Sequence, residues 1–198
     1  MEPATTTLTP PPPPPRTARV GAFAAHLARL VDTEDRAALA ALRRGLGKAP
    51  GDVAAMHPLI VPFLPDDGNP RDDASWYLVG SLFGLHPEPW RGDARNNERG
   101  PSFGATLKRL RPQKVDDREP GIDRRMVAIL NAHRDDVGTH LRQAVGLLRG
   151  GGIAVDWAHL LRDLLRWDHP DRPVQRQWAR DYYRDAPDAA GTPDAANG

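Results

Sequence analysis

The sequence predicts an all-α protein of about eight or nine helices arranged as two small helical bundles. Three observations lead to this prediction. Apolar residues recur at the three- and four-residue spacing of amphipathic helices through most of the chain. Runs that alternate apolar and polar residues, as strands do, are almost absent. Glycines, prolines and capping residues stand where one apolar stripe ends and the next begins.

The first half of the chain carries four helical segments. Their apolar stripes lie within residues 20–31, 39–46, 53–60 and 76–83. Thr33 and Asp72 are candidate N-caps of the second and fourth helices, because their side-chain oxygens can accept a hydrogen bond from a backbone N–H. Gly45 or Gly47 would end the second helix. Residues 84–101 show no periodicity and predict a long loop.

The second half continues the same pattern. Its stripes lie within residues 103–110, 122–130, 137–148, 157–167 and 174–183. Ser102 and Asp156 are candidate N-caps, and Gly150 to Gly152 would end the third of these helices. Pro170 would stop the helix that Asp156 begins, and Pro173 suits the first turn of the last helix.

Both ends of the chain differ in composition from the part between them. Residues 1–16 are rich in Thr and Pro and predict a disordered or polyproline II arm. Residues 185–198 predict a disordered acidic tail. The loop near residue 95 would divide the rest into an N-terminal bundle, residues 17–96, and a C-terminal bundle, residues 97–184. The alternative is that the loop simply interrupts one bundle.

The charge is small in total and uneven along the chain. The net charge is +1, but residues 101–184 hold 16 Lys and Arg against 11 Asp and Glu. Arginine makes up 24 of the 27 basic residues, which suits bidentate contacts to phosphate and equally fits a GC-rich genome. The sequence contains no cysteine, which excludes disulfides and thiol chemistry. No apolar run approaches the ~20 residues that span a bilayer, and the N-terminus shows no signal-peptide pattern, so we expect a cytoplasmic protein.

The sequence shows no catalytic or cofactor-binding pattern. It lacks a P-loop, a GxSxG elbow, an HExxH pair and any cluster of residues at metal-ligand spacing. His159 and Asp163 share one helix face, and we interpret them as a surface ion pair rather than a metal site. We therefore expect a protein that is not an enzyme and holds neither cofactor nor metal.

Basic residues recur on single helix faces, away from the apolar stripes. Such rows can follow a phosphate backbone and give affinity without reading sequence, although a solvated helix face would look the same. Cations near helix C-termini are also favoured by the helix dipole. The rows contain Arg43 and Arg44; Lys108, Arg109 and Arg111; Arg124 and Arg125; and Arg142 and Arg149.

Five segments resemble one known family. These are SFGATLKRLR from Ser102, RRMVAILNA from Arg124, HLRQAVGLLR from His140, LLRDLLRWDHP from Leu160 and VQRQWARDYY from Val174. They are similar to the CasB family, the small subunit of the type I-E CRISPR surveillance complex, Cascade. The resemblance covers roughly residues 17–184 and is strongest after residue 100.

The resemblance implies an all-α subunit without catalytic activity. Its partners would be the other Cascade subunits and crRNA, a second copy of itself, and the single-stranded DNA of the R-loop, where protein steadies the displaced strand. The matching basic positions are Lys108, Arg109, Arg111, Arg124, Arg125 and Arg142, with Arg43 and Arg44 as candidates by position alone. An assembly scaffold, whose arginines pair with carboxylates of partner subunits, is the alternative.

Overall fold

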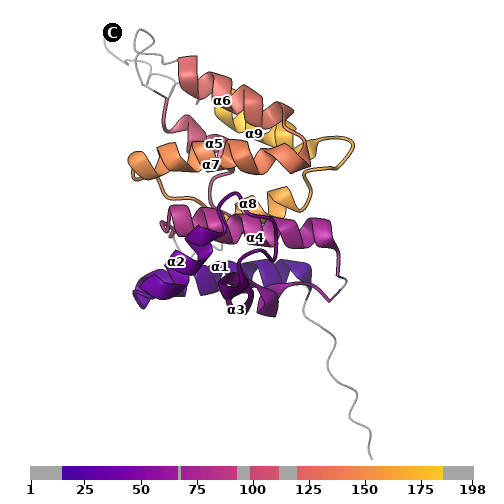
Figure 1. Ribbon diagram of the computed structural model, residues 1–198. Helices are drawn as coiled ribbons and strands as arrows, with labels where there is room; N and C mark the ends of the chain where they lie inside the picture. The colour runs from indigo at the N-terminus through magenta and orange to yellow at the C-terminus, as the bar shows by residue number, and fades with distance from the viewer. Residues whose placement is uncertain (1–14, 67, 93–98, 112–119, 185–198) are drawn as a thin grey trace, which may run out of the picture.

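The computed structural model describes residues 15–66, 68–92, 99–111 and 120–184 (Figure 1). Over these residues the chain forms nine α-helices and two short 3-10 helices, and pairing between strands is limited to an isolated bridge between Pro89 and Val155. The predicted all-α class is therefore confirmed. None of the described helices is long and apolar enough to cross a membrane.

The helices of the first half follow the predicted stripes. They are α1 (Arg16–Asp32), α2 (Arg36–Arg44), η1 (Ala54–Met56), α3 (His57–Ile60), η2 (Val61–Phe63) and α4 (Pro70–Leu85). Helix α4 is the centre of this half, since it packs against α2, α3, α7 and α8. Its side chains Trp76, Val79, Leu82 and Phe83 are fully buried, as expected for a helix covered on several sides.

Two predicted N-caps of the first half were wrong. Thr33 ends α1, and its hydroxyl donates to the Arg29 carbonyl at 2.8 Å. Glu34 then adopts a left-handed conformation, and Asp35 caps α2 by accepting from the Ala38 N–H at 2.9 Å. Helix α4 begins earlier than expected. Asn69 accepts from the Arg71 N–H at 3.1 Å and Pro70 takes the first position.

The helices of the second half are α5 (Phe103–Lys108), α6 (Pro120–Asn131), α7 (Arg134–Gly150), α8 (Trp157–Leu164) and α9 (Pro173–Tyr183). Ser102 and Asp156 cap α5 and α8 as predicted, accepting from the Ala105 and His159 N–H groups. Pro173 opens α9, also as predicted. Helix α8 ends at Leu164 in a turn, well before Pro170, so the prediction that Pro170 stops it was wrong.

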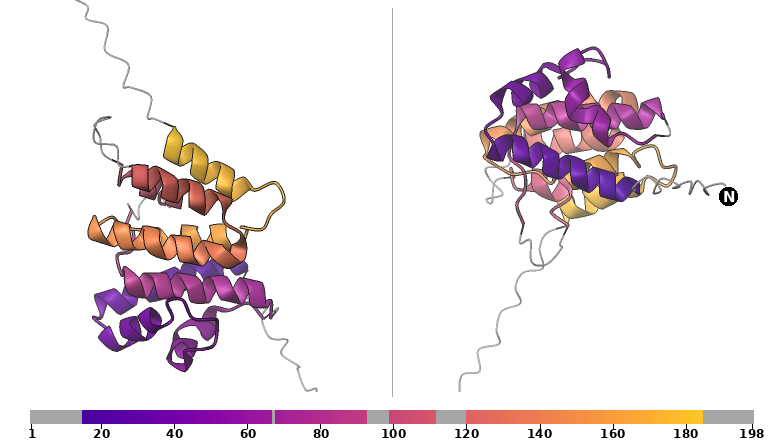
Figure 2. Two further views of the ribbon diagram at one scale, coloured as in Figure 1. Left: turned by 45° about the horizontal axis from the view of Figure 1, so that its top comes forward. Right: turned by 90° about the horizontal axis from the view of Figure 1, so that it is seen from below.

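Helix α8 joins the two halves of the chain. It comes from the second half but packs against α1 and α4 of the first (Figures 1 and 2). Trp157 at its start meets Phe83 edge to face, with ring centroids 5.6 Å apart. The buried apolar residues of both halves accordingly form one continuous cluster. The division at residues 96 and 97 stays a prediction.

Arg134 forms a second junction, at the start of α7. Its guanidinium donates to the Leu164 carbonyl at 2.8 Å, the Arg71 carbonyl at 2.5 Å and the Ser75 hydroxyl at 2.7 Å. The Asp72 carboxylate lies 3.8 Å away, and the Arg134 side chain is only 15% exposed. Asp72, predicted as a cap, is instead a buried counterion, which also pairs with Arg16 of α1 at 2.8 Å.

The predicted arm and tail lie almost wholly outside the described residues. The exception is the end of the arm, since Arg16 is the first residue of α1. Residues 1–14 and 185–198 are not described, and their predicted disorder stays a prediction.

Candidate nucleic-acid interface

A groove lies between α4, α7 and the segment that follows α2. Its volume is ≈ 880 Å³. Four basic side chains line it against two acidic ones; these are Lys48, Arg71, Arg134 and Arg142, with Asp73 and Asp135. We call it the α7 groove. Arg134 is already paired with Asp72, and the other basic side chains still outnumber the acidic ones, which favours an anionic ligand. The lining residues come from both halves of the chain.

Arg142 enters the groove beside Gly47. A Cβ atom on Gly47 would lie 2.4 Å from Nη1 of Arg142, and Gly47 has a left-handed φ of 71°. The left-handed φ favours glycine at this position, and the absence of a Cβ leaves room for the guanidinium. The backbone of the segment after α2 therefore lies close to the Arg142 guanidinium. Lys48, the next residue along the chain, also lines the groove. Two predicted cationic regions, the end of α2 and the centre of α7, thus meet at one site.

Arg43 and Arg44 lie next to this groove. Both are exposed in the last turn of α2, directly before the segment that lines it. The helix packs closely on α4 here, since a Cβ on Gly84 would lie 2.4 Å from the Arg43 backbone nitrogen. The close packing on α4 holds the backbone of this turn in place, and both arginine side chains are exposed to solvent.

Lys108 and Arg111 lie elsewhere, at the end of α9. The Lys108 ammonium donates to the Arg184 carbonyl. The Arg111 guanidinium lies 3.4 Å from the Asp123 carboxylate and 5.1 Å from the centroid of the Tyr182 ring. Its side chain is 13% exposed. These contacts tie α5 to α6 and α9, so Arg111 has a structural role whatever else it binds.

The other predicted cations divide in the same way. Arg109 and Arg124 are exposed. Arg125 is half-buried and donates to the Gly121 carbonyl at 3.2 Å. The structure therefore places Arg43, Arg44 and Arg142 around one groove and the remaining predicted residues on the α5–α6–α9 side.

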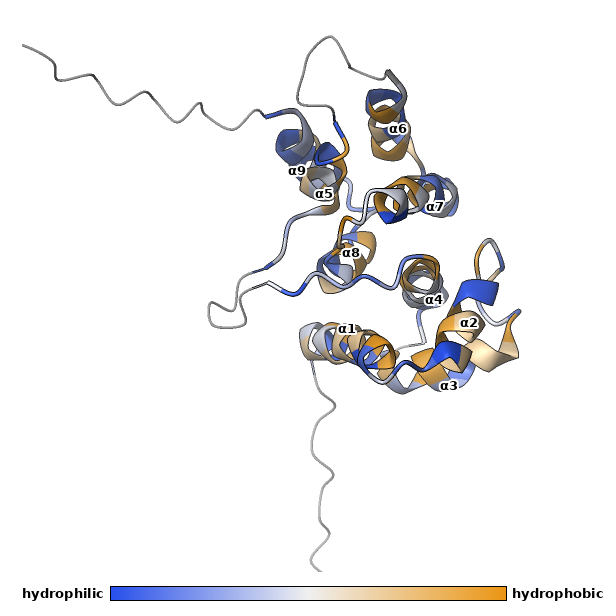
Figure 3. Cartoon of the chain, turned by 90° about the vertical axis from the view of Figure 1, so that its left-hand side faces the viewer, coloured by the Kyte–Doolittle hydropathy of each residue, from blue (hydrophilic) through white to orange (hydrophobic). Residues whose placement is uncertain are grey.

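Sequence reasoning missed the basic residues that the fold adds. Arg71 and Arg134 line the α7 groove although neither belongs to a recognisable row. On α9, Arg176, Arg180 and Arg184 are exposed at four-residue spacing, and Figure 3 shows hydrophilic residues along this outer helix. These three arginines are recognisable in the sequence as a basic coat on the last helix, whereas Arg71 and Arg134 carry no such signal.

The paired segments α8 and α9 are held by a polar contact inside the molecule. The Trp178 indole donates to the Asp163 carboxylate at 2.6 Å, and His159 lies 3.7 Å from the same carboxylate. Burial raises the pKa of Asp163, although the Trp178 hydrogen bond and the nearby His159 act in the opposite direction. The side chains of His159 and Asp163 are 18% and 17% exposed, so their interpretation as a surface pair was wrong. The described residues hold no group of three metal-ligating side chains.

Known proteins resemble the chain over most of its length. A family described as CRISPR-associated protein Cse2 matches residues 38–183. The CRISPR-associated protein Cse2 of Thermus thermophilus is 39% identical over 148 residues, which are 74% of this chain and 79% of that protein.

Solved structures agree with the sequence match. The crystal structure of CasB from Thermus thermophilus has a TM-score of 0.66 at 32% identity and covers 83% of this chain and 97% of that chain. A chain of a CRISPR RNA-guided surveillance complex has a TM-score of 0.68 at 29% identity, covering 85% and 93%. The resemblance to CasB is thereby confirmed, and the chain belongs to the Cse2 family of CRISPR-associated proteins.

Proposed function

We propose that the chain is the non-catalytic small subunit of a Cascade surveillance complex and that it holds the displaced DNA strand of the R-loop. Membership of the Cse2 family and the likeness to a chain of a CRISPR RNA-guided surveillance complex support a place in such an assembly. Its partners there would be the other Cascade subunits with crRNA and a second copy of this chain, in the cytoplasm.

The α7 groove is the observation that carries the DNA-binding part of the proposal. Lys48 and Arg142 converge in it, with Arg43 and Arg44 beside it. Guanidinium groups bind phosphate oxygens in bidentate fashion, which requires no particular base. Tyr77 is the one aromatic side chain among its described lining residues, so base stacking contributes little there. The groove therefore suits a backbone whose sequence is not read.

Modest contacts of this kind are sufficient for the task. The duplex that is opened and the heteroduplex that replaces it are nearly equal in stability, so a few phosphate contacts can tip the exchange. Holding the displaced strand in this way requires no catalytic group on the subunit.

An assembly scaffold is the second candidate, and the α6–α9 surface favours it. Val127 of α6 and Tyr183 of α9 are large apolar side chains that are 47% and 45% exposed. Arg176 and Arg180 are exposed on α9. Apolar side chains beside arginines are typical of protein interfaces.

The two candidates separate in the assembled complex. We expect Lys48→Glu and Arg142→Glu to leave the composition of the complex unchanged and to shorten the lifetime of the R-loop on a target duplex. Arg36→Glu, at an exposed position on the other end of α2, is the matched control. The scaffold function predicts the reverse, namely that Arg176→Glu with Arg180→Glu releases the subunit. An R-loop lifetime unchanged by the groove variants would overturn the DNA-binding function.

A further inference from the structure

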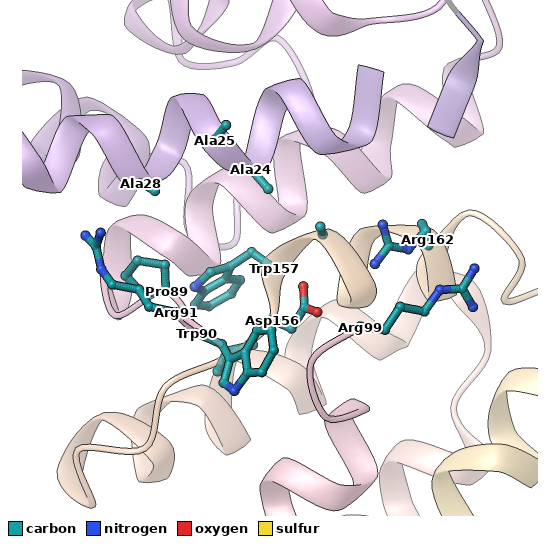
Figure 4. Close-up of a pocket in the computed structure, with 12 residues that line it drawn as sticks. Ala24, Ala25, Ala28, Pro89, Trp90, Arg91, Arg99, Asp156, Trp157 and Arg162 are labelled. Atoms are coloured by element: carbon teal, nitrogen blue, oxygen red, sulfur yellow. The ribbon is translucent and has the colours of Figure 1, made fainter. Parts of the chain in front are cut away.

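A second pocket lies away from the α7 groove, between α1, the start of α8 and the described residues Pro89 to Arg91 and Arg99 (Figure 4). Its volume is ≈ 360 Å³, within the range of small-molecule sites. Ala24, Ala25 and Ala28 of α1 form one wall, which is flat because the side chains are small. We call it the Trp90 pocket after the aromatic residue that lines it.

The Trp90 ring is held rigidly. Its backbone N–H donates to the Val155 carbonyl at 2.9 Å, within the bridge that joins this segment to the start of α8. Cβ atoms on Gly92 and Gly100 would lie 1.7 Å and 2.6 Å from the indole ring, so both glycine backbones press against it. The ring nevertheless remains half-exposed and lines the pocket. A pre-organised aromatic surface of this kind suits a flat ligand.

One end of the pocket is cationic. The side chains of Arg99 and Arg162 both lie at the end opposite Arg91 (Figure 4). Arg91 is paired with Asp32, whereas Arg99 and Arg162 form no ion pair within the described part of the chain. The Nε of Arg162 is buried and has no hydrogen-bond partner there. Two arginines without a carboxylate partner among the described residues, at one end of the pocket, favour an anionic group there, such as a phosphate.

A carboxylate lies between the aromatic ring and the arginines. Asp156 accepts from the His159 N–H at 2.8 Å through Oδ1 and from the Gly100 N–H at 2.9 Å through Oδ2. A carboxylate offers about four acceptor sites, so Asp156 keeps capacity for a donor from the pocket. Exocyclic amino groups of cytosine, adenine and guanine are such donors, whereas thymine has no amino group and offers only its single N3–H.

We propose that the Trp90 pocket binds one unstacked nucleotide of a single strand, with its base on Trp90, its amino group at Asp156 and its phosphate at Arg99 and Arg162. This inference rests on the proposed function, because the single strand is the displaced strand of the R-loop. It adds a contact that distinguishes bases to a surface that otherwise contacts only the backbone.

Fluorescence anisotropy with labelled homopolymers dC12 and dT12 tests the proposal on the full chain. Both are weakly stacked pyrimidine strands and differ in the amino group. We expect tighter binding of dC12, by about tenfold for one charge-assisted contact. Asp156→Asn keeps an N-capping oxygen and should remove the difference. Trp90→Leu and Arg162→Gln should weaken dC12 binding by about tenfold, and Trp90→Phe by less, because the ring is kept.

The α7 groove supplies the matched control. Lys48→Gln should weaken both homopolymers equally and preserve the ratio between them. Equal binding of dC12 and dT12 by the unchanged chain would overturn the proposal. Normal binding by Trp90→Leu and Arg162→Gln, with weaker binding by Lys48→Gln, would also overturn the proposal but would leave the proposed function standing.

If Lys48→Gln and Arg142→Gln affect binding of neither strand, the proposed function itself fails. If the pocket variants instead release the chain from its partner subunits with dC12 binding unchanged, the pocket takes a protein ligand and the proposal is overturned.

Discussion

The Trp178 indole Nε1 donates a hydrogen bond of 2.6 Å to Oδ2 of Asp163, and this contact fixes α9 against α8. Trp178 is fully buried and packs on Trp167, whose own indole donates to the Ala132 carbonyl at 3.1 Å. The Gln175 amide in turn donates to the Trp167 carbonyl at 2.9 Å. The segment that marks the family is thus explained by a network of buried polar contacts, because each of these donors would otherwise lack a partner.

The ionisation of Asp163 should couple to stability. Folding raises the pKa of this carboxyl above its ordinary value of 3.8, mainly through burial. The folded state therefore holds the Asp163 proton more tightly than the unfolded state does. The contribution of this group to stability is complete below pH 3.8 and is lost as the pH rises through the folded pKa. Asp163→Asn keeps an acceptor for Trp178 and has no charge. We expect the free energy of unfolding of this variant, measured with urea, to increase relative to that of the unchanged protein as the pH rises above about 4.

Asp163→Leu is the informative counterpart. It removes the acceptor and leaves the Trp178 N–H buried and unpaired, at a cost of about 1–3 kcal/mol at every pH. A constant difference between Asp163→Asn and the unchanged protein across the pH range would contradict the assigned pKa direction.

Arg134 should be the most sensitive charged residue of the fold. Its guanidinium joins α7 to both α4 and α8, and it neutralises the buried Asp72. Arg134→Met would leave that carboxylate with Arg16 alone and would remove three hydrogen bonds that join α7 to α4 and α8. We expect a loss of about 3 kcal/mol in the free energy of unfolding, typical of a broken buried pair. Arg149→Met, on the exposed end of α7, should change it by less than about 0.5 kcal/mol.

The sequence predicted the features that depend on neighbouring residues, but not the contacts between helices that are far apart along the chain. Period and capping chemistry predicted the helices, and Ser102, Asp156 and Pro173 were placed correctly because their partners are local. The cap of α2 was missed because Glu34 takes a left-handed conformation that shifts the helix start past Thr33. Arg134 could not be identified, since its role depends on where α4 and α8 meet.

The candidate site shows the same limit. The row on α7 predicted Arg142, but its meeting with the Gly45–Gly51 segment depends on how α2, α4 and α7 pack. Arg111 looked equivalent to Arg142 in the sequence. The structure separates them, because Arg111 pairs with Asp123 and covers Tyr182.

Gly47 offers a way to move Arg142 without altering it. Gly47→Ala would strain a left-handed residue, at a cost of about 1–2 kcal/mol, and its Cβ would displace the flexible guanidinium. We expect weaker binding of single-stranded DNA with the fold retained, measured by filter binding beside thermal unfolding. Gly146→Ala, where a Cβ meets open space on α7, is the matched control and should stabilise the helix slightly. Normal DNA binding by Gly47→Ala would remove Arg142 from the interface.

The salt dependence of binding measures how many phosphates the interface neutralises. If about five are contacted, the slope of log K against log salt is near −3.5, and raising salt from about 50 to 200 mM weakens binding by roughly 100-fold. Lys48→Gln with Arg142→Gln removes two of these contacts, so the slope should become shallower by about 1.4. The change should be the same on dC12 and dT12, because backbone contacts carry no base preference. A slope equal to that of the unchanged chain would show that the phosphates lie elsewhere, and the exposed arginines of α9 would then be the next surface to neutralise.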